Sequence, residues 1–333
     1  MMDKKSMDDS SKWEPVKKRY ISIRDSRTIA VLRIQDVIVS SIRDFLHKKG
    51  FIEIQAPIIG PVTDPGIRGA KQVSFDFYGS QFKIMSSMIL YKQMVVSSLG
   101  KIFSLSPNIR IEPIESQKTR RHLSEFRQID IEMAVKSYEE SMQLAEELIY
   151  HVCKEVKERC GRELKKLGRK LKIPIPPFER ITFHEAIERI KSMGFEVDRE
   201  KEISWDAEEV LSSTMQEPFF IIDYPKKARG FYYSEHEHKP GILRDFDLLF
   251  PEGYGEGISG GEREYRHEVV LTRLKESGED PKQYRWYLDM LKYGIPQSVG
   301  FGIGLERLTR WICRLDEIWQ ATPFPKVPGV ISP

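Results

Sequence analysis

The sequence has little cysteine, and its few cysteines are not spaced for a bridge or a metal site. Only Cys153, Cys160 and Cys313 occur in 333 residues, and no two of them form a C-x-x-C pair. An odd number of unpaired cysteines argues against a disulfide framework and against a zinc site, and it fits a reducing compartment. We therefore expect an intracellular, cytoplasmic protein.

Long apolar runs and an excess of one charge are also missing. No stretch reaches the roughly 18 apolar residues of a membrane-spanning helix, and residues 1–14 contain no apolar signal segment. The 53 basic and 50 acidic residues leave a net charge of only +3. The totals therefore predict a soluble protein with no membrane contact and no large positive surface, although a few local arginines can still bind phosphates or acidic substrates.

Two common nucleotide-binding motifs fail on their context. The segment GYGEGISGGERE at 253–264 contains G-x-G-x-x-G from Gly255 to Gly260, but no β-α-β unit with an acidic residue about 20 positions later follows it. Gly100-Lys101 is followed by Ile102, so no Walker loop is present either. These two failures argue against a dinucleotide-binding or P-loop fold.

What remains is a globular pattern that mixes strands with helices. Hydrophobic residues make up 40% of the chain, which is enough for a core. Residues 26–49 repeat apolar side chains at helical spacing, whereas 102–112 and 125–135 are typical of strands. We expect an α+β fold with a mainly antiparallel sheet. Residues 1–25 are predicted to be an N-terminal arm, either mobile or packed on the body, and 26–333 one catalytic domain with an inserted region at about 160–240.

Basic residues gather between the two predicted strands. Arg110 and Glu112 have period-2 spacing and point to one face of the sheet, while Arg121 and His122 lie in the connecting loop and Phe126 begins the return strand. Guanidinium groups bind phosphate through paired hydrogen bonds. The pattern suits a polyphosphate site, although a solvated basic loop would look the same in the sequence.

A second segment, SVGFGIGLERL at 298–308, alternates glycines before a helix. Gly300, Gly302 and Gly304 are spaced as in a strand against which another group packs closely. Arg307 follows in the first helical turn, where it can stack on an aromatic base or reach phosphates. Close packing of a strand on a helix is the alternative explanation.

The opening glycine-rich segment belongs to a third pattern. Asp247 and Glu256 flank a proline–glycine turn, and Arg263 ends the glycine run. Mg²⁺ takes one or two carboxylates together with phosphate oxygens. The pattern therefore predicts a Mg²⁺ site at Asp247 and Glu256.

These three patterns, in this order, resemble the motifs of the class II aminoacyl-tRNA synthetases, in particular the aspartate/asparagine branch. GFIEIQAPII resembles motif 1, NIRIEPIESQKTRRHLSEFRQIDIEM motif 2 and YGIPQSVGFGIGLERL motif 3, and the similarity covers about 28–330. The resemblance implies the class II fold, a mainly antiparallel sheet flanked by helices, and a homodimer formed through the motif 1 region around Pro57.

The resemblance also implies a role for each matching residue. Arg110 and Arg307 would be the catalytic arginines. The implied ATP contacts are Arg110 on the α-phosphate, Glu112 near the adenine or the substrate, Arg121 and His122 on the β- and γ-phosphates, and Phe126 and Arg307 on the two adenine faces. The implied amino-acid site contains Ser87, Lys92, Arg263 and Gly302, with Lys92 and Arg263 holding the side-chain carboxylate of aspartate. Asp247 and Glu256 would bind the Mg²⁺ that bridges the phosphates.

Two departures decide the function that we expect. Only about 27 residues precede the motif 1 helix, too few for the anticodon-binding OB domain of the tRNA enzymes, and Ile89 stands where those enzymes have a glutamine. Both departures resemble archaeal asparagine synthetases related to asparaginyl-tRNA synthetase. We therefore expect an AMP-forming aspartate–ammonia ligase, which turns L-aspartate, ATP and ammonia into L-asparagine through β-aspartyl-adenylate.

In this interpretation tRNA is not expected as a partner. The nitrogen donor stays open, because either free ammonia or glutamine through a second protein could supply it. Two alternative functions also stay open. One alternative is an aspartyl- or asparaginyl-tRNA synthetase that lacks the anticodon domain. The other is a non-catalytic synthetase paralogue, against which the presence of all the motif residues argues.

Overall fold

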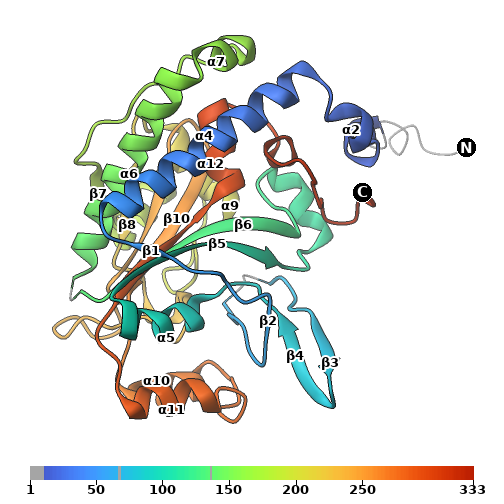
Figure 1. Cartoon of the computed structure of the whole chain (residues 1–333). Coiled ribbons are helices and arrows are strands. Elements are labelled where there is room, and N and C mark those ends of the chain that lie inside the picture. The colour runs from blue at the N-terminus through green and yellow to red at the C-terminus, as the bar shows by residue number, and fades with distance from the viewer. Residues whose placement is uncertain (1–10, 67–68, 136) are drawn as a thin grey trace, which may run out of the picture.

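The centre of the molecule is an eight-stranded sheet. The computed structural model describes residues 11–66, 69–135 and 137–333. The strands of the main sheet are β1 (Ile52–Glu53), β5 (Lys101–Ile109), β6 (Glu125–Met133), β7 (Glu179–Thr182), β8 (Phe219–Ile222), β9 (Asp245–Phe250), β10 (Gly255–Glu262) and β11 (Val299–Gly304). Their order is β1-β5-β6-β11-β10-β9-β8-β7 (Figure 1). The β1–β5 and β7–β8 pairs are parallel and the other neighbours antiparallel, which confirms the predicted α+β fold with a mainly antiparallel sheet.

Helices and a small second sheet surround this centre. The second sheet contains β2 (Ile59–Gly60), β3 (Ser74–Phe77) and β4 (Ser80–Ile84). The longer helices are α4 (Ser26–Lys48), α5 (Ile89–Leu99), α6 (Tyr138–Arg159), α8 (Phe183–Ser192), α9 (Trp205–Ser213), α10 (His267–Glu276), α11 (Arg285–Tyr293) and α12 (Leu305–Cys313). The short elements are α2 (Glu14–Lys17), α3 (Arg19–Ser22), α7 (Gly161–Leu167), η1 (Ile114–Thr119), η2 (Lys226–Ala228) and η3 (Ile318–Ala321).

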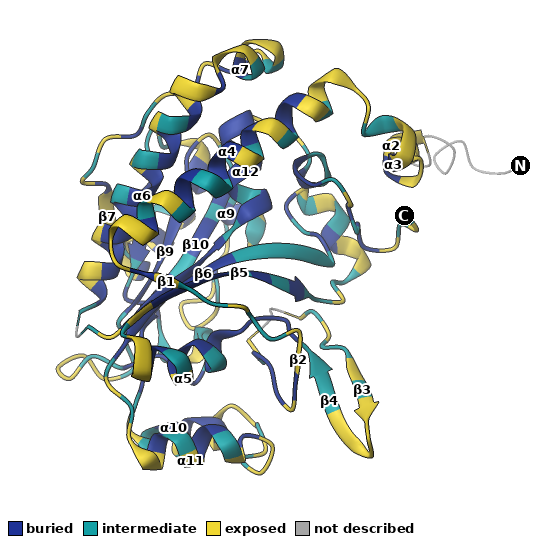
Figure 2. Cartoon of the chain, viewed as in Figure 1, coloured by how far each residue is buried: buried dark blue, intermediate teal, exposed yellow. Residues whose placement is uncertain are grey.

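Helix α4 shows how the local sequence produces the predicted element. Asp25 caps its start, because the side chain accepts hydrogen bonds from the backbone N–H groups of Arg27 and Thr28. A buried stripe that includes Ile34 and Ile38 faces the core, which α4 shares with α6, α12 and one face of the sheet. The helix ends before Gly50, whose φ of +81° favours glycine. Figure 2 shows the buried central strands beneath these helices.

Strands β6 and β11 give the sheet one apolar and one polar face. Ile129, Ile131 and Met133 of β6 belong to the buried core, and the alternate residues 128, 130 and 132 point to the opposite face. A Cβ atom added to Gly300 in β11 would lie 2.1 Å from Oε2 of Glu132 and 2.2 Å from the Ile131 carbonyl oxygen. Gly300 and Gly302 therefore make room for Glu132 and Gln128 of β6. A group packs closely on this strand, as the glycines predicted, but it belongs to the neighbouring strand and not to a helix.

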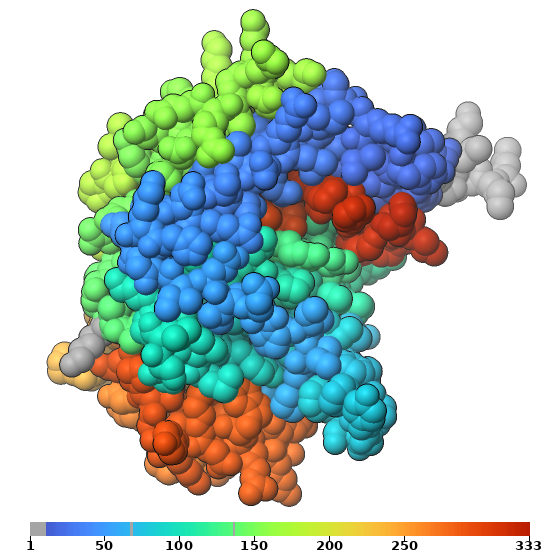
Figure 3. Space-filling model, viewed as in Figure 1, coloured from blue at the N-terminus to red at the C-terminus, as the bar shows by residue number. Residues whose placement is uncertain are grey.

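The described part of the N-terminal arm packs on the body. Trp13 and Val16 are buried against Leu123, Ile318 and Val327. In the same region the Arg19 guanidinium donates to the Thr322 carbonyl, with Nη2 2.8 Å from the oxygen, and Figure 3 shows the C-terminal segment beside these helices. Whether residues 1–25 act as one N-terminal arm stays a prediction, and residues 1–10 lie outside the described residues. No helix in the described ranges has the length and apolar character to cross a membrane.

Residues 179–222, in the region that the sequence predicts to be an insertion, form a small core. Strands β7 and β8 and helices α8 and α9 pack around buried side chains that include Ile187 and Leu211. Strand β8 pairs with β9, so this unit extends the main sheet. As a consequence, α9 lies next to β10, where the glycine-rich segment begins.

Candidate active site

A cavity of about 440 Å³ opens on the polar face of the main sheet. Its walls come from α5, the β5–β6 connection, strands β6, β10 and β11, the start of α12, and residues 227–233. The predicted site residues that line it are Ser87, Lys92, Arg110, Glu112, Arg121, His122, Phe126, Glu256, Arg263, Gly302 and Arg307. Asp247 is the one predicted site residue that does not line the cavity.

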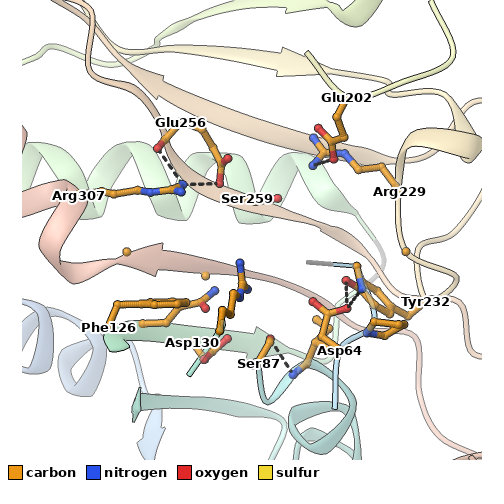
Figure 4. Close-up of a pocket in the computed structure, with 18 of the residues that line it drawn as sticks. Asp64, Ser87, Phe126, Asp130, Glu202, Arg229, Tyr232, Glu256, Ser259 and Arg307 are labelled. Atoms are coloured by element: carbon orange, nitrogen blue, oxygen red, sulfur yellow. Dashed lines mark hydrogen bonds and ion pairs between the residues drawn. The ribbon is translucent and has the colours of Figure 1, made fainter. Parts of the chain in front are cut away.

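One end of the cavity combines aromatic, acidic and basic groups. The Arg110 guanidinium lies 5.1 Å from the centre of the Phe126 ring, and its Nε donates to the Ser86 carbonyl at 3.2 Å. Figure 4 shows Phe126 and Arg307 on opposite sides of the pocket. Burial raises the pKa of Glu112, and the neighbouring Arg110 and Arg307 oppose this shift. An aromatic ring facing an arginine across a gap suits a flat heterocycle with attached phosphates.

The other end holds two cations that are already paired. Arg263 makes a bidentate contact with Glu132, with Nε 3.0 Å from Oε1 and Nη2 3.0 Å from Oε2. Lys92 Nζ lies 3.2 Å from Oδ1 of Asp130 and 3.5 Å from Oε2 of Glu132. All four side chains are almost fully buried. The expectation of a free positive clamp on a carboxylate does not fit this geometry, because two cations and two anions sum to no net charge.

Asp130 lines the cavity, and one oxygen of its carboxylate is buried and unused. Its side chain is 2% exposed, and Oδ2 has no hydrogen-bond partner within the described residues. A buried carboxylate oxygen without a partner is costly, so a bound ligand that donates a hydrogen bond would stabilise it. The sequence carried a usable signal, because Gln128, Asp130 and Glu132 alternate on one face of β6.

Sequence reasoning also missed a polar group beside Ser87. Asp64 lines the cavity, and its Oδ1 accepts from the Tyr232 hydroxyl at 3.1 Å and from the Gly66 N–H at 2.9 Å. Ser87 is buried next to this group, and Figure 4 shows these side chains at the same end as Asp130. Asp64 sits in an irregular segment without a motif, so the sequence offered no signal for it.

The two predicted metal ligands do not converge. Oδ2 of Asp247 lies 2.6 Å from Nη2 of Arg229, and Asp247 is fully buried. Glu256 lines the cavity, with Oε1 3.1 Å from Nη1 of Arg307. Within the described residues, no group of three or more potential metal-binding side chains occurs. Glu256 alone fits a Mg²⁺ ion that takes most of its ligands from phosphates and water, whereas Asp247 pairs with Arg229 away from the cavity lining.

The inserted region contributes to the cavity, which the sequence did not indicate. Trp205 of α9 lines it with a ring centre 4.3 Å from that of His122. Glu208 of the same helix pairs with Arg121, with Oε2 2.7 Å from Nη1. Arg121, predicted to hold phosphates, is therefore buried in an ion pair. The sequence around 205–208 did not predict a role for Trp205 or Glu208, because the loop that they contact lies more than 80 positions earlier.

Comparisons with known proteins place these features in one family. The model of the class II tRNA synthetases for aspartate, lysine and asparagine (D, K and N) matches residues 11–328. Asparagine–tRNA ligase of Pyrococcus abyssi is 36% identical over 318 residues, which cover 95% of this chain and 72% of the relative. The enzyme of the same name from Symbiobacterium thermophilum is 34% identical over 325 residues, covering 95% and 73%.

Solved structures agree with the sequence matches. Asparaginyl-tRNA synthetase of Pyrococcus horikoshii in complex with asparaginyl-adenylate superimposes with a TM-score of 0.90 at 34% identity, covering 96% of this chain and 73% of that one. The asparaginyl-tRNA synthetase of Entamoeba histolytica gives a TM-score of 0.88 at 29% identity, covering 98% and 74%.

These matches correct two predictions from the sequence. The similar proteins are named asparagine–tRNA ligases, so the main prediction of an AMP-forming aspartate–ammonia ligase is wrong and the tRNA-synthetase alternative is favoured. For the same reason, the expectation that tRNA is not a partner is wrong. Both errors came from the two departures that decided the expected function, the short segment before the motif 1 helix and Ile89. Lys92 added the preference for aspartate, because we interpreted it as half of a clamp, although Asp130 and Glu132 neutralise it.

Proposed function

Because the chain belongs to the class II aminoacyl-tRNA synthetases for aspartate, lysine and asparagine, we propose that it activates asparagine with ATP and transfers it to tRNA. In the first step, an α-carboxylate oxygen of asparagine attacks the α-phosphorus of ATP, which forms asparaginyl-adenylate and releases pyrophosphate. In the second step, a terminal ribose hydroxyl of the tRNA attacks the acyl carbon. The hydroxyl proton is lost, and AMP leaves.

The unused oxygen of Asp130 is the observation that carries the choice of amino acid. The side-chain amide of asparagine can donate a hydrogen bond to Oδ2, whereas an aspartate carboxylate has no donor and adds a second negative charge. The paired Lys92 and Arg263 leave no net positive charge to compensate it. Such a site rejects aspartate, because the negative charge of the aspartate side chain would stay unpaired.

The opposite end of the cavity would hold ATP. Phe126 and Arg307 would stack on the two adenine faces, and Arg110 would contact the α-phosphate, where negative charge develops during the attack. His122 lines the cavity on the same side as Arg121 and Trp205 and would face the terminal phosphates. No protein nucleophile is required, so catalysis consists of positioning and charge stabilisation.

Glu256 is the residue that would hold Mg²⁺ at the phosphates. A bound Mg²⁺ ion supplies positive charge that neutralises the phosphate oxygens. Glu256 already keeps its carboxylate at the cavity wall through Arg307. The role of Asp247 as a second ligand stays a prediction.

A homodimer through the motif 1 region is the assembly that we propose. Strand β1 is an edge of the main sheet, and Pro57 follows it. Ile52 and Ile58 are 47% and 61% exposed, which is typical of a surface that another chain covers. Light scattering of the purified chain should give twice the monomer mass, and a Ile58→Glu variant should give the monomer; a wild-type monomer would contradict the assembly.

The decisive experiment is amino-acid-dependent exchange of pyrophosphate into ATP, followed by tRNA charging. Asparagine should support exchange, and the same preparation should attach asparagine to tRNA. Exchange with aspartate but not with asparagine would refute the amino-acid assignment. Exchange without charging of any tRNA would refute the transfer step.

A further inference from the structure

Helices α10 and α11 support the amino-acid end of the cavity from outside. Their buried side chains share one core cluster with residues from three walls of this end, Val62, Leu90 and Tyr232. These residues belong to the chain that leads to Asp64, to α5 and to residues 230–233. Figure 1 shows α10 and α11 below α5. A side chain on α10 can therefore influence this end without lining the cavity.

Arg273 of α10 is a buried cation that backbone carbonyls hold. It is 5% exposed, and its guanidinium donates from Nη1 to the Tyr233 carbonyl and from Nη2 to the Gly230 carbonyl, the second at 3.2 Å. Burial lowers the pKa of Arg273, and the charges of Glu235 and Glu264 oppose this shift. A buried charge is costly unless it is hydrogen-bonded, so the guanidinium and the two carbonyls fix each other.

The two carbonyls enclose a segment of the cavity wall. Residues 230–233 line the cavity, and the carbonyls belong to the first and the last of them. Between them, the Tyr232 hydroxyl donates to Oδ1 of Asp64 at 3.1 Å (Figure 4). A Cβ atom on Gly230 would lie 2.5 Å from the Tyr232 ring, so the ring lies directly against the Gly230 backbone. Holding the two ends of the segment therefore also holds this ring.

The end of the same segment contacts Arg263. Tyr233 and Arg263 form an isolated antiparallel bridge, and the Arg263 guanidinium lies 5.2 Å from the centre of the Tyr233 ring. Arg263 lines the cavity and pairs with Glu132. One segment thus connects two charged groups of the amino-acid end, Asp64 and Arg263, and Arg273 binds both ends of this segment.

Asp64 is the charged group whose place depends most directly on the segment. The carboxylates of β6, Asp130 and Glu132, are paired with buried cations. The carboxylate of Asp64, in contrast, accepts from neutral groups in the described part of the chain, the Tyr232 hydroxyl and the Gly66 N–H. Every free amino acid carries a positive α-ammonium group. Its binding should therefore depend on where the Asp64 carboxylate lies.

We propose that Arg273 is a positioning residue for the amino-acid substrate, acting from outside the cavity through residues 230–233 on Asp64. The proposal rests on the proposed function, in which an amino acid occupies this end, and it applies to asparagine and to aspartate alike. A purely structural role makes a different prediction. If Arg273 only stabilised the packing of α10, its loss would lower stability and leave the KM values of the folded enzyme unchanged.

The test replaces Arg273 by methionine, which keeps an unbranched stem and removes the donors. Arg273→Met should raise the KM for asparagine in pyrophosphate exchange about tenfold and leave the KM for ATP within about twofold, because the segment contacts Asp64 and Arg263 at the amino-acid end. Lys275→Met, at an exposed position on the same helix, is the matched control and should change neither value. An unchanged KM for asparagine in folded Arg273→Met would overturn the proposal.

Two milder variants keep the test informative if Arg273→Met folds poorly. Arg273→Lys retains the charge but loses the fork that reaches both carbonyls, so it should raise the KM for asparagine by a smaller factor. Tyr232→Phe removes the hydroxyl that holds Asp64 and should raise the same KM. Because Arg273 acts through this segment, the double variant should be little worse than the more severe single one. Fully additive effects would mean that the two residues act separately, which contradicts the proposal.

The choice of amino acid separates this inference from the proposed function. If aspartate and not asparagine supports exchange, the amino-acid assignment fails, and the same comparison of KM values with aspartate still tests Arg273. A raised KM for aspartate in Arg273→Met, with Lys275→Met unchanged, then supports the inference. A wild-type chain that binds neither amino acid in calorimetric titrations refutes both.

Discussion

Replacing Asp130 by asparagine tests the charge balance at the amino-acid end of the cavity. Lys92 Nζ and Asp130 Oδ1 are 3.2 Å apart, and at an effective dielectric constant of about 20 that separation corresponds to an attraction of about 5 kcal/mol. The variant removes this partner and leaves Lys92 with Glu132 alone. The cluster of Lys92, Arg263 and Glu132 then carries a net positive charge, which a ligand carboxylate can compensate and an amide cannot.

Only part of that energy should change the preference between asparagine and aspartate, because Glu132 and entering water screen the charge of Lys92. If about a quarter survives, the ratio of kcat/KM for asparagine to kcat/KM for aspartate falls about tenfold, since about 1.4 kcal/mol corresponds to a factor of ten. The assay is pyrophosphate exchange at saturating ATP with each amino acid over a range of concentrations. Asp289→Asn, at an exposed position on α11, is the control and should leave the ratio unchanged.

Two results would refute the reasoning. A ratio that stays within about twofold of wild type would mean that Asp130 does not compensate Lys92 during binding. A ratio that moves towards asparagine would mean that the site had been negatively charged before the change. A parallel loss of ATP affinity would indicate general damage, and ATP titration measures it separately.

Three further outcomes are expected. Arg307→Ala should lower kcat/KM for exchange by about 10²–10³-fold while the melting temperature stays close to that of wild type. The control Arg285→Ala, at an exposed position, should have no effect. If Arg307→Ala stays active, Arg307 is not an active-site residue. Gly300→Ala should lower the free energy of unfolding in urea by about 1–3 kcal/mol, because its Cβ would meet the Ile131 carbonyl. The control Gly161→Ala, which has open space around it, should not lower it. Equal stability of the two variants would contradict the packing. Burial raises the pKa of Glu306 from its usual 4.5 to about 7. The folded state therefore binds more protons than the unfolded state in this window, and stability should fall as the pH rises through it. Glu306→Gln should make the free energy of unfolding depend less steeply on pH, as measured by urea titrations from pH 4.5 to 7. The same slope against pH in wild type and variant would contradict the raised pKa.

The local sequence was enough to predict the main elements and the site residues that follow strands. Helix α4 has its cap, its buried stripe and its terminal glycine within one segment, so its bounds follow from nearby residues. Arg110 and Glu112 both line the cavity, as predicted, although β5 ends at Ile109, so both residues lie beyond the strand whose period of two we used. The alternating glycines of β11 similarly predicted close packing, which the neighbouring side chains of β6 now explain.

The partners of the charged residues were decided only by the tertiary structure. Lys92 meets Asp130 across 38 positions, Arg121 meets Glu208 across 87, and Arg263 meets Glu132 across 131. Spacing along the chain tells which face of a strand a side chain occupies, but the charge that faces it depends on strand order, register and the packing of α9 on β10. The net charge of a buried site is the sum over such distant contacts. For this reason the residue types of the sequence located the cavity, while the folded arrangement determined that Asp130 and Glu132 neutralise Lys92 and Arg263.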